Sequence, residues 1–443
     1  MHNLKKNFIK YVSLNIIGMI GLSCYILADT FFIAKSLGTA GLAALNFSIS
    51  IFSILQGLGL MIGIGGATRF SILKNNANNK KSNSIFVHSL VIGALVSLFF
   101  VTIAIFFTTP LSAGLGADKV TLPLTKVYLT IILSFSPFFV LNNILLAFIR
   151  NDNNPKLSMT AMLISSFSNI ILDYVFMFPL SMGIFGAAFA TGLSPVISLC
   201  VLSLHFLNKK NGFRIDKCKI RISIIIDIIL LGFSSFIGEL ASAISLITFN
   251  LVILRIEGNT GVAAYGIIAN IALIAVAVFT GVAQGIQPLA SEYYGKNDTK
   301  SIRCILQYGI IAAFSLSLFI YLTAFCFSGQ IVAAFNSECD KILAYIANKG
   351  LKVYFLGYFF AGINIVATAF LSATSNSKQA MLISIMRSCI LLVPSVLILS
   401  MIFKMNGVWF AFVSTEFLVF LISCFSLHSF KKDSKVSYQN DLI

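Results

Sequence analysis

Two carboxylates lie inside stretches of the chain that are otherwise apolar enough to cross a membrane. Asp29 is near the end of the first long apolar run, and Asp173 is near the end of the fifth. A charge inside a bilayer is costly unless it is paired, hydrated or bound to a cation. The sequence therefore predicts a fold that brings these two acids together and lets them be reached from alternate sides.

Two neutral side chains accompany the acids. Asn169 precedes Asp173 by four residues, so the two share one face of a helix, and Thr191 of the sixth run is expected at a similar depth. Two carboxylates with neutral oxygens suit Na⁺, or a proton that the acids share, since neighbouring like charges resist full ionisation. Considered alone, Asn169 or Thr191 could equally form an interhelical hydrogen bond. Each acid, considered alone, could equally be a hydrated group at the outer surface. We expect the four side chains to form one ion-coupling site.

A different polar set occupies the second half of the chain. Glu239 lies in the seventh apolar run, Gln284 in the eighth, Arg387 in the eleventh and Glu416 in the twelfth. These residues are candidates for contact with a substrate in a central cavity. The alternative is that Arg387 pairs with an acid such as Glu416 and holds helices together.

The elements that position these residues follow from composition. The chain of 443 residues is 58% hydrophobic and 10% charged, whereas soluble proteins carry about 25% charged residues. We predict an all-α polytopic membrane protein with twelve spans of roughly 20 residues. Pro137, Pro195 and Pro394 indicate kinks. The predicted spans lie near 11–34, 46–68, 84–109, 125–148, 157–179, 183–207, 222–254, 261–289, 304–328, 342–371, 379–403 and 406–429.

Basic residues outside these spans predict the orientation. The connections on the N-terminal side hold 22 Lys and Arg residues, and those on the opposite side hold 6. Because basic loops stay inside the cell, both termini are predicted to be cytoplasmic. The basic linker 208–221 is then cytoplasmic as well.

The sequence also repeats itself in two halves. Gly41-Leu-Ala-Ala44 matches Gly261-Val-Ala-Ala264 at an offset of 220, and further matches continue at offsets of 222 and 224. An offset that drifts slowly over the whole length indicates two homologous six-span lobes, here 1–207 and 222–443. The lobes should be pseudo-symmetric bundles around a central cavity, as in parallel-repeat transporters. The repeat places Phe249 or Asn250, and not an acid, at the counterpart of Asp29.

No pattern in the chain indicates an enzyme. The four histidines are scattered and the eight cysteines form no CxxC pair or metal spacing. No nucleotide-binding domain is present, so transport must be driven by an ion gradient. We expect no cofactor beyond the coupling ion, no nucleic-acid partner, and a monomer in the cell membrane that handles small amphipathic or cationic substrates.

Several motifs together resemble the multidrug and toxic compound extrusion (MATE) family of secondary transporters. They are residues 29–44, residues 150–156, Asn169-x-x-x-Asp173, residues 284–288, and Arg387 followed by Pro394. The resemblance implies two lobes in an outward-tapering V and export of amphipathic, often cationic compounds in exchange for Na⁺ or H⁺. It also implies a cation site in the first lobe, at positions that match Asp29, Asn169, Asp173 and Thr191.

The chain departs from the family pattern at three places. The first span has no proline, Phe32-Ile-Ala34 replaces a Phe-Val-Gly-like sequence, and no acid stands at the middle of the tenth span as a partner for Glu239. A second ion site in the second lobe is therefore not expected. A flippase for lipid-linked precursors is the alternative function, although few basic residues inside the spans could meet phosphates. A non-transporting sensor or channel would not need a repeat around buried acids.

Overall fold

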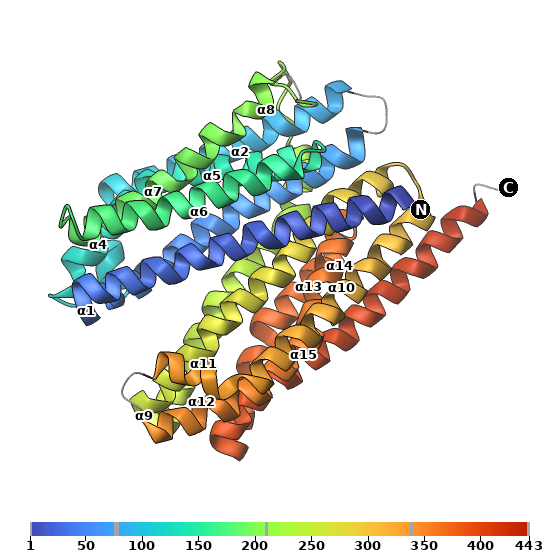
Figure 1. Cartoon of the computed structure of the whole chain (residues 1–443). Coiled ribbons are helices and arrows are strands. Elements are labelled where there is room, and N and C mark those ends of the chain that lie inside the picture. The colour runs from blue at the N-terminus through green and yellow to red at the C-terminus, as the bar shows by residue number, and fades with distance from the viewer. Residues whose placement is uncertain (1, 75–78, 209–210, 337–339, 441–443) are drawn as a thin grey trace. The chain divides into compact units, whose positions relative to one another are not determined.

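The protein is helical throughout the part of the chain that the structure describes. The computed structural model describes residues 2–74, 79–208, 211–336 and 340–440, and shows helices, turns and short connections there (Figure 1). The α-helices are α1 (His2–Lys74), α2 (Asn79–Phe106), α3 (Thr108–Gly114), α4 (Thr121–Ser134), α5 (Ser136–Asn151), α6 (Pro155–Met177), α7 (Gly183–Leu202), α8 (Leu204–Leu207), α9 (Ile222–Gly295), α10 (Thr299–Cys326), α11 (Ser328–Phe335), α12 (Lys341–Tyr354), α13 (Tyr358–Ala373), α14 (Ser377–Ile385) and α15 (Leu392–Asn440). A 3₁₀ turn (Phe355–Gly357) joins α12 to α13, and a π-helical turn (Met386–Ile390) joins α14 to α15.

Three of the helices are longer than one membrane crossing. α1 has 73 residues, which at 1.5 Å per residue is roughly three and a half times the thickness of a bilayer core. It changes direction at Gly38, α9 does so at Gly258 and α15 at Lys404, where the backbone leaves helical geometry. The remaining apolar helices supply one crossing each when the bent pair α4–α5, the pair α12–α13 and the helices around the π turn are each counted as one span. The described residues thus form the twelve predicted spans.

Two of the three prolines at which the sequence predicted kinks lie beside helix irregularities. α4 and α5 meet at an angle of 49°, and Pro137 stands in the first turn of α5, where a missing N–H costs nothing. Pro394 follows the π turn. Its nitrogen carries no hydrogen, so it cannot donate a hydrogen bond to the carbonyl of Ile390, the residue at which that turn ends. Pro195 lies inside α7, which continues from Gly183 to Leu202.

The helices confirm the repeat element by element. α2 and α10 have matching bounds at a shift of 220 residues, and the breaks at Gly38 and Gly258 show the same shift. α5 and α13 begin and end at a shift of 222. The sequence matches therefore reflect two structurally equivalent sets of helices and not chance similarity in a biased composition.

The chain packs into two compact units. One comprises Ile17–Glu239, and the other comprises Met1–Ile16 together with Leu240–Ile443. In the second of these units, Gly281 and Gly285 of α9 lie against the backbone of Ile16 and Val12 at the start of α1. The division of the chain into lobes at 1–207 and 222–443 stays a prediction. Lys209 and Lys210 of the linker fall outside the described residues.

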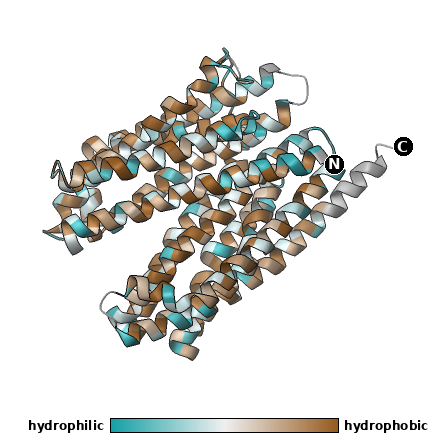
Figure 2. Ribbon diagram, viewed as in Figure 1, coloured by the Kyte–Doolittle hydropathy of each residue, from teal (hydrophilic) through white to brown (hydrophobic). Residues whose placement is uncertain are grey.

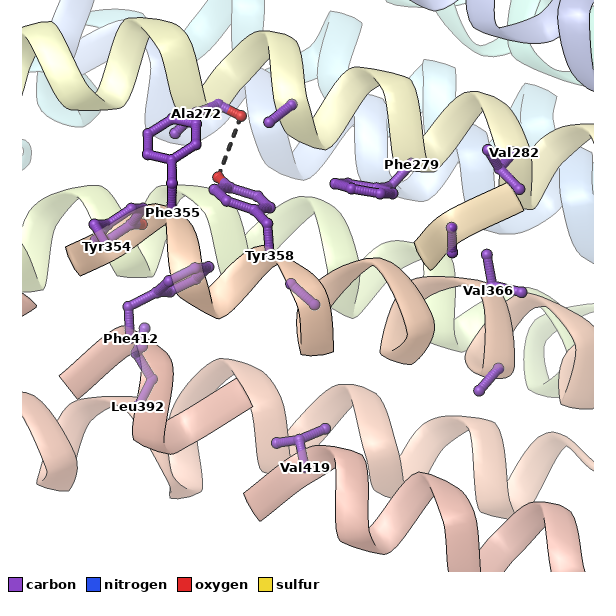
Figure 3. Close-up of a cluster of buried hydrophobic side chains, with 14 of the residues drawn as sticks. Ala272, Phe279, Val282, Tyr354, Phe355, Tyr358, Val366, Leu392, Phe412 and Val419 are labelled. Atoms are coloured by element: carbon purple, nitrogen blue, oxygen red, sulfur yellow. Dashed lines mark hydrogen bonds between the residues drawn. The ribbon is translucent and has the colours of Figure 1, made fainter. Parts of the chain in front are cut away.

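The core of the unit that contains the C-terminus is rich in aromatic rings. Tyr354 and Phe412 stack with centroids 4.1 Å apart, and Tyr358 packs against Phe279 (Figure 3). The Tyr358 hydroxyl donates to the carbonyl of Ala272 at 3.4 Å, so its polar end is satisfied inside the bundle. Large apolar side chains such as Met401 and Phe425 point outward instead, and hydrophobic residues cover most of the helices along their length (Figure 2). This exposed apolar surface suits lipid as the surrounding solvent.

Candidate functional site

The first half of α1 packs lengthwise on α6. Gly18 and Gly21 lie close against the side chains of Met162 and Leu163. Beyond Asp29, the ring of Phe32 lies 6.2 Å from that of Tyr174. The two helices lie side by side (Figure 1) and therefore keep one register over about four turns. This register sets Asp29 opposite Asp173.

The buried face of α6 carries the polar residues that the sequence singled out. Asn169 and Asp173 share this face with other buried residues at spacings of three and four, and both are fully buried. α7 packs antiparallel on α6, with Ser165 and Ser194 oxygens 2.6 Å apart. The rings of Phe176 and Phe189 meet at 5.6 Å further along the same pair. Thr191, buried on α7 between these two contacts, is thereby placed opposite Asn169.

Asp29 completes the group and is only 7% exposed. It is close enough to Asp173 for an electrostatic interaction, and both acids interact in the same way with the hydroxyl groups of Tyr25 and Tyr128. Tyr128 of α4 also lies beside Thr191. The structure therefore brings all four predicted side chains into one cluster. Asp29 lies nine residues before the break at Gly38. It is therefore further from the end of its helix than the predicted span 11–34 indicated.

Sequence reasoning missed the two tyrosines of this cluster. Tyr25 stands one helical turn before Asp29, so the i, i+4 spacing could have identified it. Tyr128 comes from α4, and nothing in the sequence relates it to α1 or α6. The rings give the acids a largely apolar wall with a polar edge.

Six polar atoms of the four predicted side chains have no hydrogen-bond partner among the described residues. Within the described part of the chain, Oδ1 of Asp29, both carboxylate oxygens of Asp173, both amide atoms of Asn169 and Oγ1 of Thr191 are buried without one. Leaving a buried polar group unsatisfied costs about 1–3 kcal/mol, and more for a charged group. The donor set consists of two acids, an amide and a hydroxyl, which fits a hard cation or a proton.

Glu239 belongs to the same unit but not to this cluster. It is half buried on α9, next to Gly57 of α1, and acts electrostatically on Tyr25. A hydrogen bond of 2.7 Å from Asn143 to Gln56 lies in the same unit. Glu239 is thus a separate acid of the same unit, close enough to Tyr25 to interact with it electrostatically.

The other three candidates lie in the second unit. Nε of Arg387, in the π turn, donates to Oε1 of Glu416 at 2.6 Å. Asn364 donates to Oε2 of Glu416 at 2.9 Å and accepts a hydrogen bond from Ser423. The ion pair that stood as the alternative to a substrate-contacting role for Arg387 and Glu416 is therefore present. Gln284 is buried and bonded, one residue from the contact between Gly285 and the start of α1.

A second polar cluster lies where α5 ends and was not predicted. The Asp152 carboxylate accepts hydrogen bonds from Lys74 and from the N–H of Gly212, and lies 3.0 Å from Nε2 of the buried His205. Burial alone would raise the pKa of Asp152, but these partners hold it below its ordinary value. In the sequence, residues 150–156 indicate only a family resemblance. The hydrogen bonds of Asp152 could not be predicted, because its partners are distant in sequence.

Twelve spans in two equivalent sets, with unpaired acids buried in one of them, define a multi-pass membrane transporter. A family model, MatE, matches residues 15–175 and 234–398, so the chain belongs to the MatE family. Members of this family are transporters and not enzymes.

Named relatives and solved structures agree with this assignment. The chain is 26% identical to the multidrug export protein MepA of Staphylococcus saprophyticus over 379 residues, 85% of this chain and 82% of that one. MepA of Staphylococcus aureus is likewise 26% identical and 83% covered. A solved structure of the MATE multidrug transporter DinF-BH aligns with a TM-score of 0.87 at 26% identity, covering 96% of this chain and 95% of that one.

The fold alone does not fix the substrate. A transporter from Pyrococcus furiosus, described as having a binding pocket of reverse polarity that suggests a different function, aligns with a TM-score of 0.87 at 21% identity, over 97% of each chain. What this chain transports must be argued from its own residues.

Proposed function

We propose that the protein exports amphipathic, often cationic compounds by alternating access, in exchange for Na⁺ or H⁺. The coupling ion binds among Asp29, Asn169, Asp173 and Thr191. The observation that carries the proposal is the set of buried, unpartnered oxygens on these four side chains. The multidrug relatives support the substrate class.

Electrostatics gives the coupling its physical basis. Two buried carboxylates that face each other without a counter-charge disfavour the packed arrangement of α1, α6 and α7. A bound Na⁺ or a proton removes part of this repulsion and stabilises that arrangement. The ion therefore shifts the equilibrium between conformations by its difference in affinity for them, which is the requirement for coupled transport.

The orientation and assembly are part of the same proposal. The excess of basic residues in the loops on the N-terminal side supports cytoplasmic termini and a multi-pass protein of the cell membrane. All four proposed ion ligands come from a single compact unit of one chain. A monomer is thus sufficient for function.

An efflux assay tests the proposal. In cells without their own pumps, the wild type should export a fluorescent lipophilic cation under an imposed Na⁺ or pH gradient. Asp29→Asn and Asp173→Asn should slow ion-driven export by at least about tenfold, the equivalent of 1.4 kcal/mol. Asp227→Asn is the matched control, because this acid pairs with Arg69 at 3.1 Å outside the cluster.

The outcomes separate the parts of the proposal. Export by both cluster variants at the wild-type rate would exclude the ion site. A wild type that exports no cation under either gradient would exclude drug export. A response to only one of the two gradients identifies the coupling ion.

A further inference from the structure

The segment 211–221, between α8 and α9, is held against its unit by its backbone and by inward side chains. Phe213 is fully buried among Phe70, Phe86 and Phe148, with ring centroids 4.6–5.7 Å away. The N–H of Gly212 donates to Asp152. At the other end, the N–H of Arg221 donates to Nε2 of the buried His88 at 2.9 Å. The segment is therefore held near both of its ends.

The side chains that face away from the unit have an unusual composition. Arg214, Lys217, Lys219 and Arg221 are all exposed. Ile215 and Ile220 alternate with them and are 75% and 61% exposed. A stretch of charged residues that is simply solvated by water has no need of an isoleucine side chain that is three-quarters exposed. The segment's acid, Asp216, accepts a hydrogen bond from Asn83, which draws it toward the unit.

The start of α9 shows what surrounds this surface. Ile222, Ile226 and Leu230 are exposed at spacings of four residues, so they form one apolar stripe on the helix. Because α9 is apolar enough to span a membrane, lipid tails are the surroundings that suit this stripe. Lys219 and Arg221 stand within three residues of its beginning, about one helical turn. Their charges therefore lie at the depth of the headgroups.

We propose that residues 214–222 form a binding surface for anionic phospholipids. The four cations meet the lipid phosphates, while Ile215, Ile220 and Ile222 enter the region between headgroups and tails. The bound leaflet is the cytoplasmic one in the orientation proposed above. The anchored backbone presents these side chains without first having to order the loop, which lowers the entropic cost of binding.

Lipid binding to the purified full-length chain tests this proposal. Native mass spectrometry with phosphatidylglycerol and phosphatidylcholine should show a clear preference of the wild type for the anionic lipid. The variant Arg214→Gln/Lys217→Gln/Lys219→Gln should bind phosphatidylglycerol about fivefold more weakly for each charge removed, the equivalent of about 1 kcal/mol per residue near a membrane. Its binding of phosphatidylcholine should not change.

A matched triple variant provides the control. Lys296→Gln/Lys300→Gln/Arg303→Gln removes the same number of charges from the connection after α9 and the first turns of α10, and should keep wild-type lipid binding. An equal loss in both triple variants, or no preference for the anionic lipid, would overturn the proposal.

The isoleucines distinguish a lipid from a soluble anion. Ile215→Ser/Ile220→Ser should weaken phosphatidylglycerol binding but leave the weak binding of glycerol 3-phosphate unchanged. If glycerol 3-phosphate binds the wild type as tightly as the lipid does, the surface is a site for soluble anions and the proposal fails.

Discussion

Arg387 lies 2.6 Å from Glu416, and this ion pair neutralises the acid that is buried between α13 and α15. Asp29 and Asp173, in the other unit, have no such partner among the described residues. One unit thus carries its own counter-charge for its buried acid, and the other needs a cation from solution. This contrast supports an ion site confined to the unit Ile17–Glu239.

Breaking the Arg387–Glu416 pair should reveal a structural role. Arg387→Met leaves Glu416 buried and unpaired, so the free energy of unfolding should fall by about 3–5 kcal/mol. In the double variant Arg387→Met/Glu416→Gln no uncompensated charge remains, and most of the loss should be recovered. Denaturant unfolding in detergent measures both. A double variant as unstable as the single one would contradict this account.

Thr191→Val should decide which ion the cluster binds. The substitution keeps the shape of the side chain and removes one neutral oxygen, which a Na⁺ coordination shell uses and a proton on a carboxylate does not. If Na⁺ is the ion, the concentration for half-maximal export should rise about tenfold, the equivalent of 1.4 kcal/mol. If H⁺ is the ion, the proton concentration for half-maximal export should stay within about twofold of the wild-type value.

Thr415→Val is the control for this experiment. Thr415 is the repeat counterpart of Thr191, is fully buried, and also has a hydroxyl without a partner. It lies in the unit without the two acids. Equal effects of the two substitutions on Na⁺ dependence would show a packing effect and refute a ligand role for Thr191.

The sequence predicted much of this site because its signals are local or periodic. Asn169 and Asp173 share a helix face by spacing alone, and the repeat relates elements 220 residues apart. The partners of Asp152 and the position of Tyr128 depend on how helices pack, which no spacing reveals. The π turn around Arg387 also has no sequence signature, although Pro394 indicated a local irregularity.

Asp152 should stabilise the fold in a pH-dependent way. Its pKa is lower in the folded protein than the ordinary value near 3.9. The carboxylate therefore contributes its full stabilisation above that ordinary value and loses it as the pH falls through the lower folded value. Asp152→Asn should lower the unfolding midpoint at pH 7, and the difference from wild type should shrink below about pH 4. A difference that grows toward low pH would refute this sign.

Lys404 should be the strained member of the three breaks in the long helices. Its φ of 50° and ψ of −131° resemble the geometry at Gly38 and Gly258, where no side chain opposes the conformation. A non-glycine residue there costs about 1–3 kcal/mol. Lys404→Gly should therefore raise the unfolding midpoint, whereas Gly258→Ala should lower it. Lys404→Ala removes the charge but keeps Cβ, so a gain from the alanine equal to that from glycine would show that charge, and not backbone strain, is the cause.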